Sequence, residues 1–259
     1  MEPKSENSET LSVMELMVRL HLDNPRQGPG SEEMTKLALR LAKISPEKSY
    51  RIADIGCGTG AQTITLAENI QGEIIAVDLF KAFLDKLEER ILKKNLKSPI
   101  KTMVASMDDL PFKEKELDVI WSEGAVYNMG LKKGVRYWRN FLKTGGILAV
   151  SELSWVTSDR PKELEDFWNG EYHEMDTVSG KIKILEDEGY RVLGHFILPD
   201  DCWLDNYYYP LLESHKNFLQ QFGHLEAARQ IVETDKQEVD FYMKYKNYYS
   251  YGFYIAQKV

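Results

Sequence analysis

Cysteine and histidine are scarce in this chain of 259 residues, and their spacing argues against two classes of protein. Cys57 and Cys202 stand far apart, so the sequence offers no disulfide framework and favours a reducing cytoplasm. The histidines show no H-x-x-x-H spacing and no C-x-x-C pair accompanies them, so no zinc site or other metal is predicted. The five histidines are His21, His173, His195, His215 and His224.

The chain also lacks an excess of positive charge and long apolar runs. Its formal net charge is −8, and polyanions repel an acidic protein. Nucleic acid and an anionic membrane surface are therefore not expected as partners. No apolar run reaches the about eighteen residues that suggest a membrane span. Residues 1–10 are polar and lack a charged-then-apolar leader, so we expect a frayed tail without a secretory signal.

A glycine-rich turn is the most informative segment that is present. Residues 52–55 predict the end of a buried strand, Gly56, Gly58 and Gly60 follow at alternate positions, and a helical pattern begins at Ala61. A strand, a glycine turn and a helix in this order form a nucleotide-cradling loop, because glycine lets a ligand approach the backbone closely. Dinucleotide-binding turns usually read G-x-G-x-x-G, whereas this turn reads G-x-G-x-G.

A second strand is predicted over residues 73–78, and it ends in an acid. Asp78 lies 22 positions after Gly56 (78 − 56), where a carboxylate can accept hydrogen bonds from two ribose hydroxyls. The alternative is an acidic cap for the helix predicted over residues 79–94. Both roles could hold, and an acid at this position suits any cofactor that contains adenosine, so Asp78 does not separate S-adenosylmethionine from NAD.

The run Asp54-Ile-Gly-Cys-Gly-Thr-Gly60 resembles the first motif of class I S-adenosylmethionine-dependent methyltransferases. The resemblance extends over roughly residues 50–152. It includes the loop at residues 106–112, a strand over residues 116–122, and a Lys-Thr-Gly-Gly turn at residues 143–146 that leads into a fifth strand. Two positions depart from the family pattern, since Ser106 stands where an acid is usual and Thr144 where proline is usual.

The resemblance implies an α/β fold with a Rossmann-like, doubly wound, seven-stranded sheet, an antiparallel last strand and helical cap segments. We expect one methyltransferase domain over residues 1–259. Two N-terminal helices, predicted over residues 11–22 and 31–43, either fold over the cofactor or add a packing layer. The expected parts are cover helices at 1–45, a cofactor-binding core at 46–200, a helical insertion at 204–246 and the last strand at 247–259.

The family's site residues are carried over position by position. The cofactor would be S-adenosyl-L-methionine, and the resemblance places Asp54 near its ammonium group and Ser106 or Asp108 near the adenine. Bare backbone N–H groups of the turn would suit its carboxylate. The residues expected to bind the cofactor are Asp54, Gly56, Cys57, Gly58, Gly60, Asp78, Leu79, Ser106, Met107, Asp108 and Ser122.

Residues after the fourth and fifth strands are the candidates for catalysis and acceptor binding. Glu123 could act as a general base, hold a cationic acceptor, or contact the cofactor through its backbone, and Tyr127 could contact the acceptor or pack under the cap. Asn128, Trp155 and Tyr208 are expected at the acceptor. The alternative for Tyr208 and its neighbouring tyrosines is packing of the insertion onto the sheet.

These patterns predict an enzyme that transfers a methyl group from S-adenosylmethionine to a small-molecule acceptor by in-line displacement, with S-adenosyl-L-homocysteine as the second product. The sequence does not name the acceptor, because pockets on this fold are built from variable segments. The alternatives are a non-catalytic module that binds the cofactor and acts on a protein partner, or another adenosine-cofactor enzyme of the same fold. A turnover assay separates these hypotheses.

Overall fold

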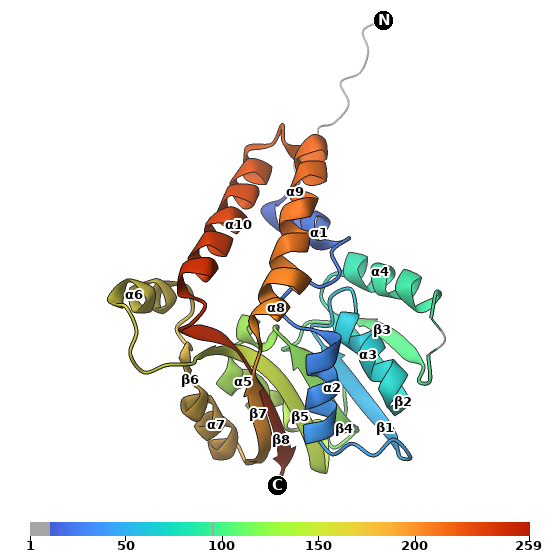
Figure 1. The fold of residues 1–259 in the computed structure, drawn as a ribbon. Helices are drawn as coiled ribbons and strands as arrows, with labels where there is room; N and C mark the ends of the chain where they lie inside the picture. Colours follow the sequence, from blue (N-terminus) through green and yellow to red (C-terminus); the bar gives the residue numbers. More distant parts are fainter. Residues whose placement is uncertain (1–10, 95) are drawn as a thin grey trace, which may run out of the picture.

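The fold is built around one mixed β-sheet, which the computed structural model describes together with its helices over residues 11–94 and 96–259 (Figure 1). The strand order is β3-β2-β1-β4-β5-β8-β7, and a short strand, β6, pairs with β5. The first five strands run parallel, whereas β8 runs antiparallel to both β5 and β7. The predicted fold class is therefore confirmed, including the antiparallel last strand. The tail predicted at residues 1–10 lies outside the described residues.

The strands begin and end close to the predicted positions because their apolar residues form clear runs. Their bounds are β1 Ser49–Ile55, β2 Gln71–Asp78, β3 Ile100–Val104, β4 Leu117–Glu123, β5 Leu142–Trp155, β6 Asp176–Thr177, β7 Tyr190–Ile197 and β8 Tyr249–Lys258.

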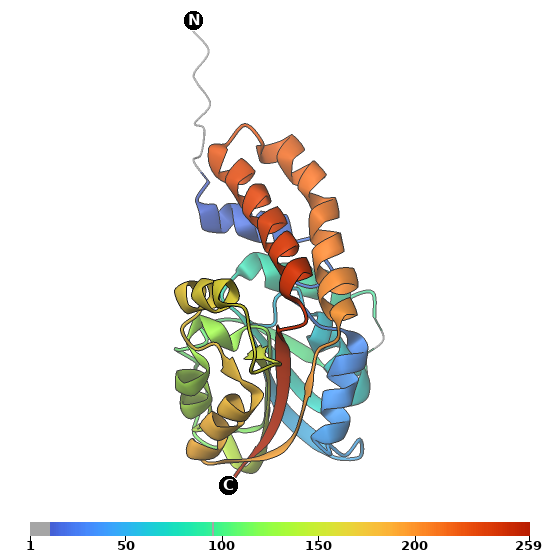
Figure 2. The same ribbon diagram turned by 60° about the vertical axis from the view of Figure 1, so that its left-hand side comes forward.

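Helices cover both faces of the sheet, so neighbouring strand residues are buried in opposite layers. In β4, Val119 and Trp121 belong to one apolar cluster and Ile120 belongs to the other. Figure 2 shows α2 on one side of the sheet and α5 with α7 on the other. The covering helices are α2 Glu32–Leu41, α3 Ala61–Asn69, α4 Lys81–Ile91, α5 Leu131–Trp138 and α7 Val178–Asp187.

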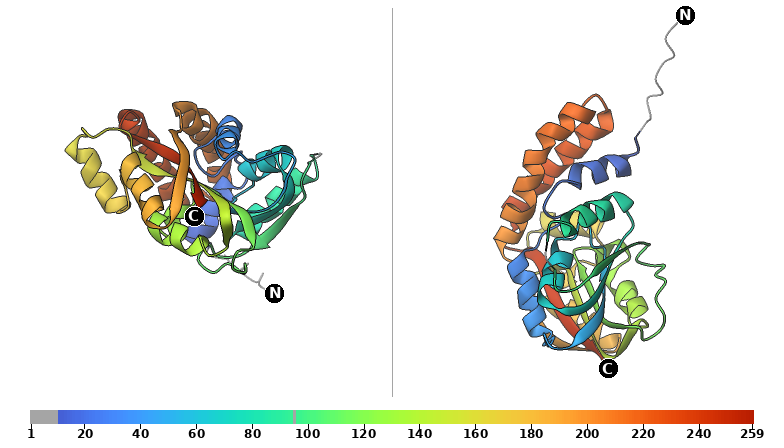
Figure 3. Two further views of the ribbon diagram at one scale, coloured as in Figure 1. Left: turned by 90° about the horizontal axis from the view of Figure 1, so that it is seen from below. Right: turned by 90° about the vertical axis from the view of Figure 1, so that its right-hand side faces the viewer.

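A helical cap stands above the carboxyl ends of the parallel strands (Figures 1 and 3). It consists of α1 with the long α9 and α10, which share an apolar cluster that includes Leu16, Leu20, Leu211 and Phe218. A π-helical turn, η2, leads into the cap. The bounds are α1 Val13–His21, α6 Lys162–Glu171, α8 Asp200–Trp203, η2 Leu204–Tyr208, α9 Tyr209–Phe222 and α10 Glu226–Tyr245. None of the described helices is both long and apolar enough to span a bilayer.

The main local difference from the sequence prediction lies before the fifth strand. The apolar spacing of Leu131, Val135, Trp138, Phe141 and Leu142 predicts a helix over residues 131–142. In the structure α5 ends at Trp138, and β5 already begins at Leu142. Leu142 pairs with Leu117, and the register then shifts so that Ile147 pairs with Val119. Gly145, with φ of 78°, lies in this shift. The predicted Lys-Thr-Gly-Gly turn is therefore an irregularity within one long strand.

Candidate functional site

The glycine turn between β1 and α3 requires its glycines. Gly56, Gly58 and Gly60 have φ of 72°, 56° and 83°, a region that residues with a Cβ rarely adopt. A Cβ on Gly56 would lie 2.4 Å from the Cβ of Ala125, and one on Gly60 would lie 2.2 Å from a methyl group of Leu87. The turn is thus closely packed against neighbouring elements as well as strained for other residues.

Asp78 at the end of β2 holds this turn in place. Its carboxylate accepts one hydrogen bond from the backbone N–H of Gly58 at 2.8 Å and another from the N–H of Phe80 at 2.9 Å. Burial raises the pKa of Asp78, and the backbone donors oppose this shift. The helix-capping alternative is wrong: the N-cap of α4 is Phe80, no side chain caps it, and the bond from the Phe80 N–H to Asp78 closes a local turn before the helix. Each carboxylate oxygen has a second acceptor position, so ribose binding by Asp78 stays a prediction. The neighbouring Leu79 is 58% exposed.

Asp54 lies behind the turn rather than facing solvent. It is completely buried and accepts hydrogen bonds from the Thr63 hydroxyl at 2.5 Å and the Gln62 amide at 3.4 Å. Burial raises its pKa to about 7, and the nearby carboxylates of Glu123 and Asp78 add to the shift. Asp54 therefore joins β1 to α3, and a direct contact with a cofactor ammonium would require the turn to rearrange.

The buried carboxyl of Asp54 leads to a prediction about stability and pH. Between its ordinary pKa of 3.8 and about 7, folded Asp54 keeps a proton that the unfolded chain has released. Raising the pH through this window therefore lowers the free energy of unfolding, by at most about 1.4 kcal/mol per pH unit for one group. Asp54→Asn, which cannot ionise, should show a flatter dependence and gain stability relative to the parent at pH 8.

Chemical denaturation of both proteins at pH 5, 6, 7 and 8 measures this difference. Glu152, whose pKa burial also raises to about 7, remains in the variant, so the slope should shrink without vanishing. Parallel curves for parent and variant would contradict the prediction.

The third group of predicted cofactor residues surrounds the loop after β3. The Ser106 hydroxyl donates to the Asp108 carboxylate at 2.5 Å, so the two residues proposed for the adenine act as a pair. Met107 lies with its terminal methyl 3.7 Å from where a Cβ on Gly56 would be, and its carbonyl accepts the indole N–H of Trp138.

Two other predicted cofactor residues have their side chains buried. The Ser122 hydroxyl donates to the carbonyl of Ile55 at 2.8 Å. Burial raises the pKa of the Cys57 thiol well above its ordinary value. These two positions can face a ligand through their backbones alone.

The segment between α1 and α2, residues 22–30, lies over the glycine turn, and we call it the covering loop. Gln27 accepts hydrogen bonds from the backbone N–H and the hydroxyl of Thr59 at 2.8 and 3.0 Å. The Arg90 guanidinium donates to the carbonyls of Asn24 and Thr59 at 2.8 and 2.9 Å, and so joins α4, the turn and the covering loop. The covering loop therefore contacts the turn directly.

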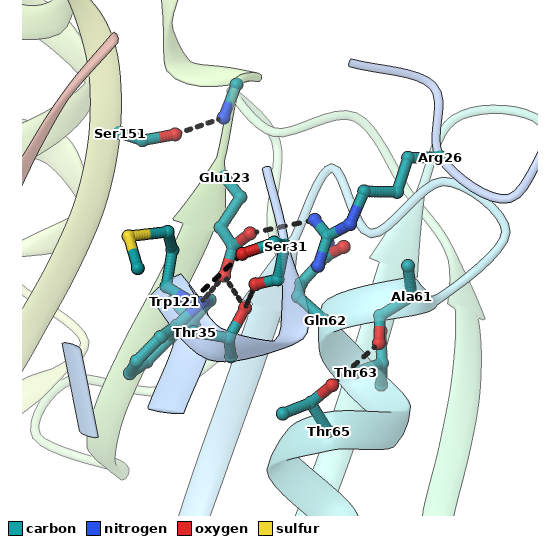
Figure 4. Close-up of polar contacts among 12 residues, drawn as sticks. Arg26, Ser31, Thr35, Ala61, Gln62, Thr63, Thr65, Trp121, Glu123 and Ser151 are labelled. Carbon is teal, nitrogen blue, oxygen red and sulfur yellow. Dashed lines mark hydrogen bonds and ion pairs between the residues drawn. The ribbon is translucent and has the colours of Figure 1, made fainter. Parts of the chain in front are cut away.

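Arg26 extends from the covering loop to Glu123 at the end of β4 (Figure 4). Their ion pair measures 3.0 Å, and the two side chains are only 9% and 4% exposed. Glu123 also accepts hydrogen bonds from the Thr35 hydroxyl at 2.7 Å and the Trp121 indole at 2.9 Å. These three donors hold the carboxylate in one position, whereas its catalytic role stays a prediction.

A small cavity of about 60 Å³ lies between the covering loop and the glycine turn. Ligand pockets usually have about 300–1,000 Å³, so the loop must shift outward for a cofactor to enter. Sequence reasoning did not assign roles to Arg26, Gln27 and Arg90. The sequence feature that could have drawn attention to Arg26 is its place as a single arginine in a loop rich in glycine and proline. The cavity is lined by Arg26, Gln27, Gly28, Pro29, Gly56, Cys57, Gly58, Gln62, Glu123 and Gly124.

The residues predicted for the acceptor are spread along the carboxyl edge of the sheet. Tyr127 and Asn128 lie in a short 3₁₀ turn, η1 Val126–Asn128, and the Asn128 amide donates to the Ala125 carbonyl. The Trp155 ring is buried, with the Arg160 guanidinium 4.7 Å above it.

Tyr208 is 1% exposed, and its hydroxyl donates to Glu238 at 2.9 Å. Its ring lies against Trp203 and Tyr242. This position agrees with the packing alternative, and a direct acceptor contact by Tyr208 stays a prediction.

A larger and more open hollow of about 710 Å³ lies at the opposite edge, near Tyr50, Arg51 and Lys97. It lies at the amino ends of β1 and β2, whereas open α/β sheets bind ligands at the carboxyl ends. Within residues 11–94 and 96–259, no three histidine, cysteine or acidic side chains gather as metal ligands would.

Comparison with known proteins places this geometry in a family context. Residues 52–146 match the family model described as a methyltransferase domain. An uncharacterized protein of Haemophilus influenzae is 25% identical over 191 residues, which cover 65% of this chain and 75% of that protein. The 27-O-demethylrifamycin SV methyltransferase of Amycolatopsis mediterranei is 26% identical over 129 residues, and this match covers 49% of the chain and 47% of that enzyme.

The fold is also shared with solved structures. A SAM-dependent methyltransferase of Geobacter sulfurreducens, solved with S-adenosyl-L-homocysteine, superposes with a TM-score of 0.79. The superposition covers 94% of this chain and 98% of that protein at 16% sequence identity.

Proposed function

Because residues 52–146 match a methyltransferase domain and the fold is shared with a SAM-dependent methyltransferase, we propose that the chain transfers the sulfonium methyl group of S-adenosylmethionine to a small-molecule acceptor beneath the helical cap. The observation that carries the proposal is the enclosure of the sheet edge beyond Gly124. The cap turn η2 and the start of β8 meet there, and the Tyr251 hydroxyl would lie 3.8 Å from a Cβ on Gly124. A covered, aromatic edge suits a small molecule better than a macromolecular surface.

The residues that line the small cavity can hold the amino-acid end of the cofactor. The groups that would bind it differ from those that the sequence suggested. All five backbone N–H groups of residues 56–60 already donate within the protein: to Val77, to Asp78, to Gln27 and to Cys57. The cofactor carboxylate therefore needs another donor. Among the described residues that line the cavity, Arg26 is the cation, and Glu123 beside it suits the ammonium group.

The adenosine end would lie over β2 and β3. Asp78 has free acceptor positions for the ribose hydroxyls, and the exposed Leu79 and the Met107 side chain offer apolar surface for the adenine ring. Ser106 and Asp108 offer polar groups beside them. Localisation in the cytoplasm accords with two free, buried cysteines and remains part of the proposal.

Bound S-adenosylmethionine supplies a methyl group that its sulfonium charge already activates. The protein must hold the acceptor in line with the C–S bond and keep water out. The cap and the covering loop perform the second task, and the carboxyl edge of the sheet performs the first. A base is required if the acceptor arrives protonated.

Incubation of the purified protein with methyl-labelled S-adenosylmethionine and a metabolite extract tests the proposal. Label should appear in the small-molecule fraction, with S-adenosylhomocysteine formed in equal amount. Cofactor binding without turnover would favour the non-catalytic module, label on protein or nucleic acid would overturn the small-molecule acceptor, and binding of NADH in place of S-adenosylmethionine would overturn the cofactor.

Substitution of Asp78 is expected to weaken cofactor binding in two distinguishable ways. Asp78→Ala loses both the ribose acceptor and the bond that holds the Gly58 N–H, at a cost of about 1–3 kcal/mol of binding free energy. Asp78→Asn keeps one acceptor oxygen and should lose less. Titration calorimetry with S-adenosylmethionine measures both variants. Unchanged affinity in Asp78→Ala would show that the carboxylate does not contact the ribose.

A further inference from the structure

Beyond Gly124, tyrosines and carboxylates from separate segments gather under the cap, and we call this group the inner recess. The rings of Tyr127 and Tyr172 meet edge to face with centroids 6.3 Å apart. The pKa of the Tyr251 hydroxyl is raised by burial and then by the neighbouring charges of the group. These segments come together where β5, β8, α6 and α10 approach each other (Figure 1). The recess consists of Tyr127, Glu152, Tyr172, Tyr207, Glu238 and Tyr251.

The accessibility of these side chains shows that they line a recess rather than an outer surface. Tyr127 is 43% exposed, yet burial raises the pKa of its hydroxyl. Glu238 is also exposed, and burial likewise raises the pKa of its carboxyl. A side chain that is surrounded by protein and is still accessible to solvent lies in the wall of a concavity. Gly124 lines the small cavity beside the glycine turn, and it also lies against the hydroxyl end of Tyr251. The inner recess and the small cavity therefore adjoin at Gly124.

Glu152 is the deepest charged group of the recess, and its hydrogen bonding is incomplete. The residue is fully buried on β5, and neither carboxylate oxygen has a hydrogen-bond partner among the described residues. The ammonium of Lys181 lies 3.6 Å away, but it donates to the Glu174 carbonyl and faces the Tyr172 ring. The Tyr172 hydroxyl lies beside Glu152 without reaching hydrogen-bond geometry and has no other partner in the described chain.

Buried polar groups in folded proteins are nearly always hydrogen-bonded, because an unpaired one costs free energy. Two neighbouring groups that lack partners, in a recess that adjoins the cavity at Gly124, therefore indicate a ligand that brings hydrogen-bond donors. The recess has two carboxylates against the one ammonium of Lys181, and tyrosine faces attract cations. The missing donor is accordingly best supplied by a cationic group.

We propose that the acceptor is an amine, held as an ammonium ion in the inner recess, and that Glu152 is the catalytic base that deprotonates it. This inference rests on the proposed function and names its substrate class. The ammonium gives a proton to the Glu152 carboxylate, and the freed nitrogen lone pair attacks the methyl carbon. The N–C bond forms as the C–S bond breaks, the electron pair stays on sulfur, and the positive charge moves to the methylated nitrogen.

The electrostatics of the recess suit this role. Burial raises the pKa of Glu152 to about 7, where a base is effective near neutral pH, while Lys181 opposes the rise. Burial lowers the pKa of Lys181, and the surrounding carboxylates oppose that change. The titratable groups around Glu152 come from every neighbouring element: Lys181 from α7, Tyr172 and Glu174 from the segment after α6, Tyr127 from η1, and Tyr251 and Tyr254 from β8.

The test uses the full-length protein loaded with S-adenosylhomocysteine and a panel of primary and secondary amines, each paired with the alcohol of the same skeleton. Tyramine and its alcohol are one such pair. Calorimetry should find amines that bind at least about tenfold more tightly than their alcohols. In Glu152→Gln this preference should be lost and methyl transfer to the bound amine should fall about a hundredfold or more, with the affinity for S-adenosylmethionine kept. Glu171→Gln, an exposed acid at the end of α6, is the matched control.

The pH profile provides a second readout. In the unsubstituted protein kcat/KM should rise through about pH 7 as Glu152 ionises, and this limb should disappear from the residual activity of Glu152→Gln. If that variant does not fold, Tyr172→Phe carries the test, because it removes only the hydroxyl beside the carboxylate and should lower the preference for amines.

Equal binding of alcohols, an unchanged preference in both variants, or failure of every amine to bind would each overturn the amine proposal. The proposed function fails differently, through absence of cofactor binding or through label on a macromolecule. Methylation of an uncharged small molecule by Glu152→Gln at the parent rate would overturn the amine proposal alone.

Discussion

Valine in place of Gly58 is expected to abolish cofactor binding, with a loss of affinity of about a hundredfold or more, equivalent to about 3 kcal/mol. The residue sits at φ of 56°, which a β-branched side chain adopts only with strain. Its Cβ would lie 2.4 Å from the Gln27 carboxamide oxygen, so the covering loop would also be displaced. Titration calorimetry measures the affinity, and circular dichroism with a thermal melt verifies the fold.

Gly170→Val is the matched control for this variant, because a Cβ at Gly170 in α6 meets no atom within 4 Å. It should bind S-adenosylmethionine like the parent. A folded Gly58→Val protein with parental affinity would contradict the assignment of the turn to the cofactor.

Loss of the Arg26 guanidinium is expected to have the second large effect, on stability and on binding together. Arg26→Met leaves the Glu123 carboxylate buried without its cation, which should lower the free energy of unfolding by about 3 kcal/mol. The same variant loses the proposed partner of the cofactor carboxylate, so its affinity should fall about tenfold to a hundredfold.

The double variant Arg26→Met with Glu123→Gln separates these effects. It removes both charges of the buried pair, so most of the stability should return, because a neutral pair is not penalised for desolvation. Cofactor affinity should stay low. Chemical denaturation and calorimetry of the parent, both single variants and the double variant form a complete cycle. Recovery of affinity in the double variant would show that Arg26 serves the fold and not the ligand.

Local sequence patterns were sufficient for the frame of the site. The strand before Gly56, the glycines themselves and Asp78 are close in sequence, and backbone geometry alone dictates their arrangement. The same reasoning predicts Asp54 near the ligand, which stays a prediction, but it does not reveal that the side chain is buried between β1 and α3. A side chain at the end of a parallel strand can face either layer, and the contact with Thr63 and Gln62 decides which.

The other parts of the site could not be predicted, because they depend on contacts between segments that are distant in the sequence. Arg26 and Glu123 are 97 positions apart, and only the folded chain brings the covering loop onto the turn. Glu152 left a signal that could have been used, since its charge interrupts the buried run of β5, whereas Lys181 lies among half-buried and exposed residues of α7 and left none. A charge in such a stretch is costly unless it is paired or has a role, and their mutual distance could not be seen in one sequence.

The first helix, α1, contacts both the helical cap and the inner recess. Leu16 and Leu20 anchor α1 in the cap cluster, and His21 stacks on Tyr207 of the inner recess with ring centroids 6.3 Å apart. The next residues form the covering loop over the glycine turn. We therefore expect spent cofactor to leave when that loop lifts, and we expect the movement to displace His21 and so loosen its contact with the recess. The release of the cofactor product and the release of the methylated product are therefore coupled. We expect the two products to leave in a fixed order, with loop opening rather than chemistry setting the turnover rate.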